Sequence, residues 1–445
     1  MLNNKLIGTA LIFILGITFN AKLLASTFCF NNLQANYTPF VTTFGDYTKY
    51  TVYDESQHFI YFFDKRAPDA ASYNKNLIST LKNNLEYSFE YYHCELGFMP
   101  FSTLEKAHVY IENHPPGLNG TSPFNYNYIT INDDLILGAV IQDKLVTTPS
   151  HELFHKTQYK LGHTADENVS ESIAALAERL PSLQHFNHSL ASKHMIFTHP
   201  EANNSFSTYS NALFWQYLIE QVHGPTSQTI THDSPTKKLL VELVEIAQQG
   251  GLYARETIKQ FINSEATSSS TSHSDIEVMD NFITAKYSYP FINLNLQPKF
   301  GFWHKNNYLN HGYDLQYYQQ HTIAPDDKFN ISNRNVYYYL TGFASDTGFM
   351  RFLAAEYREL IVSPGVQELS FKNNLQDPDI RMQVIVRFTD DTIQRYIIDS
   401  QQPYLTVKKP LPKPVSQIIF AAYTIKNHPR AGSNGRNFDI TIKAN

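Results

Sequence analysis

A five-residue run, His151-Glu152-Leu153-Phe154-His155, constrains this chain more than any other feature. On an α-helix, residues four apart lie one above the other, so the imidazoles of His151 and His155 can point to one place. Neutral imidazole nitrogens bind Zn²⁺ well, at about 2.0–2.1 Å. Glu152 projects from the side of the same helix and can reach a water molecule at the metal without ligating the metal, which suits a general base. The run therefore predicts a helix that holds a metal ion.

The flanking residues predict where this helix begins and ends. Thr148 can cap it, and Pro149 can occupy the first helical position, where its missing N–H costs nothing. Gly162 can end it. Gln158 lies seven residues past His151 and returns to the metal-facing side. Two interpretations of Gln158 stay open: a partner of a metal ligand or of the substrate, or a polar residue at the border of the core.

A carboxylate that can serve as the third metal ligand follows at Glu171. Residues 171–180 are rich in Ala, Leu and Glu, which favour a helix. Glu178 lies seven residues beyond Glu171 and shares its face. We therefore predict a second helix, packed against the first, that carries both glutamates. Asp166 is an alternative third ligand, and Glu167 is interpreted as a residue that complements the dipole at the start of the helix.

The order of these residues resembles the gluzincins, which are zinc peptidases with two histidines from an H-E-x-x-H run and a glutamate from the next helix. The likeness is to secreted bacterial metallopeptidases with a short gap between the two helices. It implies that His151, His155 and Glu171 hold one Zn²⁺ per chain and that Glu152 is the general base. Cysteine spacings of a structural zinc ribbon are absent, which excludes that kind of site.

The resemblance is specific over residues 145–180 and looser over roughly 45–290. Fifteen residues separate His155 from Glu171, fewer than in the aminopeptidase and thermolysin branches. Ser172 stands where the family usually has glycine. These departures leave metal ligation intact but weaken the transfer of finer detail.

The N-terminal residues predict export. Residues 1–26 have the features of a secretory signal, with Lys5 before an apolar stretch at 6–19 that is short for a membrane span. An uncleaved anchor is the alternative. Cleavage would yield a periplasmic or extracellular protein without stable membrane insertion. In such a protein Cys29 and Cys94 can form a disulfide, and two free thiols are the other possibility.

The pattern of apolar residues predicts an α+β chain in three parts after the signal. Residues 27–144 form the α/β part of a gluzincin-like catalytic domain, in which the strand at 126–132 is expected at the sheet edge above the site. Residues 145–290 form its helical, metal-binding part. Residues 295–445 contain short strands at the spacing of a β-sandwich. Tyr209, at the start of a predicted helix, either donates to an oxyanion or packs.

These features together predict an exported zinc metallopeptidase that acts on a peptide or protein. The net charge of −6, without a basic run, argues against nucleic acid as a partner. An endopeptidase is favoured, because the Gly-x-Met-Glu-Asn segment of the aminopeptidase branch is absent. Two alternatives stay open: a catalytically silent exported protein that binds glycan or protein on this scaffold, and a zinc amidase that acts on a non-protein substrate of the cell envelope. The sequence does not indicate an oligomeric state.

Overall fold

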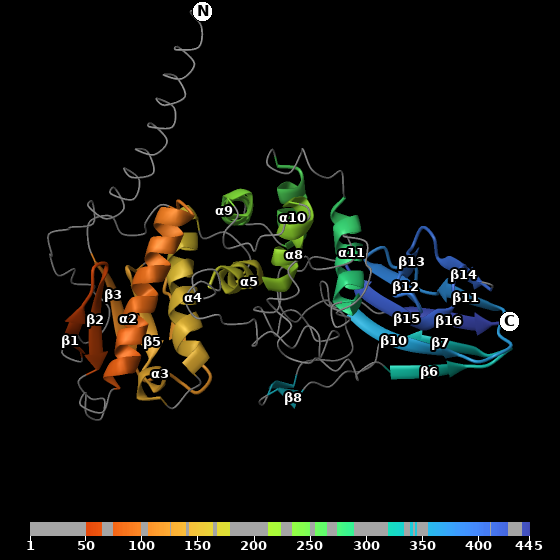
Figure 1. The fold of residues 1–445 in the computed structure, drawn as a ribbon, viewed down its shortest axis with the longest axis horizontal. Coiled ribbons are helices and arrows are strands. Elements are labelled where there is room, and N and C mark those ends of the chain that lie inside the picture. Colours follow the sequence, from red (N-terminus) through yellow and green to blue (C-terminus); the bar gives the residue numbers. More distant parts are fainter. Residues whose placement is uncertain are drawn as a thin grey trace, which may run out of the picture. The chain divides into compact units, whose positions relative to one another are not determined.

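A computed structural model describes sixteen segments of the chain and shows that it is α+β (Figure 1). The segments are 50–64, 74–98, 106–124, 126–138, 142–162, 167–178, 212–223, 234–249, 254–264, 274–288, 319–332, 339–340, 343–344, 355–409, 411–425 and 438–445. The predicted signal peptide lies outside the described residues. Within the segments that are described, none of the helices has both the length and the apolar character that a membrane crossing requires.

Contacts divide the chain into two units. The first contains the described residues up to Gly162 together with Ala177 and Glu178. Its sheet has the order β1-β2-β3-β5-β4, with parallel pairing from β2 through β3 to β5 and antiparallel strands at both ends. The strands are β1 (Tyr50–Glu55), β2 (Phe59–Asp64), β3 (Ala107–Glu112), β4 (Gly120–Thr121) and β5 (Tyr128–Asn132).

The expectation that the strand at 126–132 lies at the sheet edge is wrong. This segment contains β5, which pairs with β3 on one side and with β4 on the other. Ile129, Thr130 and Ile131 are all buried, so both faces of this strand are covered. The strand at the end of the sheet is β4, whose two residues are too few to show a strand pattern in the sequence.

Four helical segments accompany this sheet: α2 (Lys75–Glu90), the π-helical turn η3 (Tyr91–Glu95), α3 (Asp134–Leu137) and α4 (Gln142–Leu161). Figure 1 shows α2 alongside α4. The predicted start of the metal helix at Thr148 and Pro149 is wrong, because α4 begins earlier and contains the proline. A proline removes one backbone donor from a helix. Side chains of Asn84 and Ser150 both donate to the carbonyl of Val146, three residues before the proline.

The second unit contains residues 164–176 and the chain from 189 onward. Its helices are α5 (Glu167–Ala177), α8 (Ala212–His223), α9 (Ser234–Gln249), α10 (Ala254–Ile262) and α11 (Asp275–Ser288). The division between the two units falls within α5, so this one helix belongs to both. The predicted boundaries at 145 and 290 separate segments of different secondary structure, which is a different criterion from this division by contacts.

Two larger sheets lie in the same unit, in the orders β13-β12-β15-β10-β6 and β14-β11-β16-β7, beside the small pair β8-β9. Among the strand pairs described in this unit, only β10-β6 is parallel. The strands are β6 (Gln319–Ile323), β7 (Lys328–Ser332), β8 (Tyr339–Leu340), β9 (Phe343–Ala344), β10 (Ala355–Val362), β11 (Glu368–Asn373), β12 (Ile380–Phe388), β13 (Ile393–Ile398), β14 (Tyr404–Lys408), β15 (Val415–Thr424) and β16 (Asp439–Ala444).

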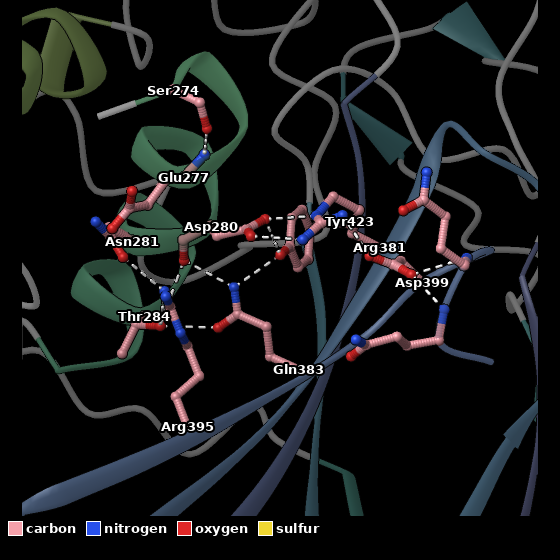
Figure 2. Close-up of polar contacts among 12 residues, drawn as sticks. Ser274, Glu277, Asp280, Asn281, Thr284, Arg381, Gln383, Arg395, Asp399 and Tyr423 are labelled. Atoms are coloured by element: carbon pink, nitrogen blue, oxygen red, sulfur yellow. Dashed lines mark hydrogen bonds and ion pairs between the residues drawn. The ribbon is translucent and has the colours of Figure 1, made fainter. Parts of the chain in front are cut away.

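Helix α11 is fastened to the first of these sheets by a buried polar network (Figure 2). Arg381 on β12 donates to both carboxylate oxygens of Asp280 on α11, each at 2.7 Å, and to Asp399 at 2.9 Å. Tyr423 on β15 donates to Asp280 at 2.5 Å. Gln383 on β12 donates to the main-chain carbonyl of Asp280 at 2.7 Å. These hydrogen bonds join α11 to β12 and β15 of this sheet.

This network generates a prediction about stability. Asp280 is 4% exposed, and Arg381→Met removes the side chain that donates to both of its carboxylate oxygens. We expect the free energy of unfolding to fall by about 3–5 kcal/mol, the usual cost of breaking a buried ion pair from one side. Denaturant unfolding followed by circular dichroism measures this loss. Lys413→Met is the control, because it removes an ion pair with Asp390 at the surface. Equal losses in both variants would contradict the prediction.

Candidate metal centre

The two histidines of the run lie on α4 with their rings converging. Both are buried, and their Nε2 atoms are 3.0 Å apart. The ring planes are nearly perpendicular, at 88°. This convergence follows from the helical repeat, because residues four apart share a face. The Nε2 atoms of His151 and His155 therefore point to one place.

The other ring nitrogens are held by side-chain oxygens. Nδ1 of His151 donates to the carboxylate of Glu178 at 2.8 Å, and Nδ1 of His155 donates to the amide oxygen of Gln158 at 2.8 Å. An ionised carboxylate only accepts, so Nδ1 of His151 carries the proton. With the proton at Nδ1, each neutral ring presents an Nε2 lone pair to the other.

The space between the two Nε2 atoms fits a metal ion. Two lone pairs 3.0 Å apart repel each other unless a cation or an extra proton lies between them. Two nitrogen ligands of tetrahedral Zn²⁺, each at about 2.0–2.1 Å, are about 3.3 Å apart. A small opening of the observed separation therefore accommodates zinc. The oxygen partners at Nδ1 are the kind that orient ligand histidines in zinc sites.

Glu171 completes the group. One donor atom from each of His151, His155 and Glu171 lies within 4.8 Å of the others. Glu171 lies on α5. Glu178, which we predicted on the same helix, directly follows the end of α5 at Ala177. The 4.8 Å spread is wider than the about 3.3 Å between ligands of tetrahedral zinc, so binding would draw the Glu171 carboxylate inward.

Glu152 lies against the edge strand. Its side chain is buried, and it is outside the three-residue donor group. A Cβ atom added at Gly120 in β4 would lie 2.9 Å from Cγ of Glu152, 2.9 Å from a methyl carbon of Thr148 and 2.9 Å from the carbonyl oxygen of Thr130. Only glycine allows this approach. The backbone of β4 therefore passes directly beside the carboxylate that we predict to be the base.

A buried tyrosine that the sequence did not single out joins the two metal-bearing helices. The hydroxyl of Tyr92 is 3.2 Å from the carbonyl of Ser150 and 3.3 Å from the carbonyl of Ala177. These residues come directly before His151 and Glu178. Burial raises the pKa of the Tyr92 phenol, so it stays protonated and able to donate. Nothing in the local sequence distinguishes this tyrosine from one that only packs.

Lys156, which follows His155, is buried at 3% exposure. Its ammonium group donates to the main-chain carbonyls of Pro123 and Tyr126, the latter at 2.7 Å. Burial lowers the pKa of Lys156 to about 7, and the charge of Glu152 opposes this shift. The lysine thus attaches the segment after β4 to the metal helix.

The remaining predicted residues are divided between the described and undescribed parts of the chain. Cys94, in η3, is disulfide-bonded, and the described residues include no free cysteine. Its predicted partner Cys29 lies outside the described residues, as do Tyr209 and the alternative ligand Asp166.

No protein-family model matches this chain, and no curated protein matches it either. The functional argument therefore depends on the geometry around α4 and α5.

The contact between Glu178 and His151 predicts a contribution to metal affinity. Glu178→Gln retains an acceptor oxygen but removes the charge that makes the imidazole a stronger donor to the metal. We expect zinc affinity, measured by competition with a chelator, to fall about 10–100-fold. Glu55→Gln is the matched control, since Glu55 on β1 is half-exposed and pairs with Lys106. Unchanged zinc affinity in Glu178→Gln would contradict the assignment.

The position of Tyr92 predicts that its hydroxyl contributes both to stability and to zinc binding. Tyr92→Phe keeps the ring but removes the hydroxyl that joins the two helices. We expect the free energy of unfolding to fall by about 1 kcal/mol and zinc binding to weaken measurably. Tyr61→Phe, which removes a buried hydroxyl bonded to Ser56, should lower stability similarly without changing zinc affinity. Equal zinc affinity in both variants would rule out a positioning role for Tyr92.

Proposed function

We propose that this protein is an exported zinc metallopeptidase that hydrolyses peptide bonds as an endopeptidase. One Zn²⁺ per chain would be held by His151, His155 and Glu171. The observation that carries the proposal is the 3.0 Å approach of two Nε2 atoms in a group with a third donor, with Glu152 buried on the same helix as the histidines and outside that donor group. This arrangement leaves one carboxylate for catalysis.

Zinc bound here would supply a Lewis acid that polarises a carbonyl and makes water more acidic. We assign Glu152 the transfer of a proton from the attacking water to the leaving amine. Glu178 and Gln158 hold the two histidine rings in orientation through their Nδ1 atoms. Tyr209 remains a candidate donor to the oxyanion.

The edge strand supports a peptide as the substrate. Among the described strands, β4 is the last of its sheet, so its outer side can pair with an extended peptide. Gly120 in β4 lies against Glu152, which would bring a paired peptide close to the base. A chain that lies along a strand edge need not end there. This favours cleavage within a chain over removal of terminal residues.

We further propose a gluzincin-like catalytic domain and a sandwich-like C-terminal region. Contact between the rings of Phe420 on β15 and Phe438, just before β16, supports packing of the two larger sheets, with centroids 6.1 Å apart.

The decisive experiment compares the mature protein with Glu152→Gln. Both are assayed for zinc content and for cleavage of casein and of a quenched-peptide library, with Glu55→Gln as the control. We expect stoichiometric zinc in all three and cleavage by all except Glu152→Gln, because the change removes the base and leaves the ligands. Full activity in Glu152→Gln would exclude Glu152 as the base.

Two other outcomes would change the functional assignment. Zinc without cleavage by any variant would favour a binding protein or an amidase with a non-protein substrate. Absence of zinc from all of them would make the H-E-x-x-H run a structural coincidence.

A further inference from the structure

The segment between β4 and β5 is fixed to the metal helix by a buried charge. Lys156 donates to the carbonyls of Pro123 and Tyr126, which lie on either side of Phe124. Burying an ammonium group is costly unless its hydrogen bonds are replaced, and here two carbonyls replace them. The lysine also lies 5.6 Å from the ring centroid of Tyr159 and 5.9 Å from that of Tyr128. The position of Phe124 is therefore imposed by α4.

Aromatic rings form a row from a metal ligand to the surface. The ring of Tyr159 stacks on His155, with centroids 5.9 Å apart and planes 13° apart. Phe124 meets Tyr159 edge to face, at 5.2 Å and 90°. Phe124 is 45% exposed. The row thus begins at a candidate zinc ligand and ends in an apolar surface that solvent reaches.

A single exposed aromatic is ordinary on a protein surface. Phe124 differs because its segment is held by a buried lysine and because it follows the edge strand by three residues. A second exposed apolar side chain, Leu118, comes two residues before that strand and is 40% exposed. Apolar surface therefore lies at both ends of the strand that we propose pairs with substrate.

We propose that Phe124 and Tyr159 form a wall of a subsite that binds a bulky apolar side chain of an extended peptide, and that Lys156 is its positioning residue. This inference rests on the proposed function and specifies its substrate class. The two ring-to-ring steps put Phe124 within about 11 Å of His155. An extended peptide advances about 3.3 Å per residue, so the preferred side chain lies within about three residues of the bond that is cleaved.

Peptide binding tests the subsite without requiring turnover. Zinc-loaded Glu152→Gln protein is titrated with extended peptides that differ only in a Phe or an Ala, placed in turn at each position along the peptide. We expect one position at which Phe binds about tenfold more tightly or better than Ala. Adding Phe124→Ser should abolish that preference and leave the Ala peptide unaffected. With the active protein, the same preference should appear in KM rather than kcat.

Two further variants complete the test. Tyr404→Ser removes an aromatic that is 65% exposed on β14 and should leave the preference unchanged. Lys156→Met should reduce the preference while zinc content stays stoichiometric, because the segment loses its attachment. If Lys156→Met does not fold, the comparison of Phe124→Ser with Tyr404→Ser still shows whether the preference for Phe depends on Phe124.

Each outcome separates the subsite from the catalytic proposal. A Phe preference that survives Phe124→Ser, or its absence at every position, would overturn the subsite even if the wild-type protein cleaves peptides. A Phe preference that depends on Phe124 would support the subsite even if no peptide is cleaved, and the proposed peptidase activity alone would then fail.

Discussion

The hydrogen bond between His151 and Glu178 is the interaction on which the candidate centre depends. It sets the proton on Nδ1, so that Nε2 is left to bind a metal. Glu178 directly follows the end of α5, the helix that carries Glu171, so this one contact joins a histidine of α4 to the residue after that helix. Tyr92 adds a second connection, because its hydroxyl contacts the carbonyls of the residues directly before His151 and Glu178.

The sequence could predict this centre because its spacings are local. The pairing of His155 with His151 and the positions of Gln158 and Glu178 follow from helical periods of four and seven residues. The start of α4 was predicted wrongly for the same local reason: a proline usually marks a first turn. Here Asn84, far away in the sequence, donates to a carbonyl near the proline, and no local pattern contains that information.

The surroundings of the centre could not be predicted, because they depend on long-range contacts. A two-residue edge strand has no pattern, and Gly120 matters only because Glu152 lies against it. The C-terminal part contains short strands, as predicted, and the clearest of them in the sequence have long apolar runs, such as β12 and β15. The strand β7 gives a weaker signal, because its polar and apolar residues alternate over only five positions and a single one is buried.

The charges around the centre give an independent reason for a cation. Glu152 and Glu178 are buried and Glu171 is half-buried, while Lys156 is a buried lysine beside them. When all four groups are ionised, the three carboxylates outnumber the one ammonium group by two charges. Like charges gathered in a buried place repel one another, and an opposite charge beside them favours their ionised forms. One divalent ion bound by the histidines would cancel that excess. The carboxylates that orient the ligands and supply the base therefore also favour binding of the metal.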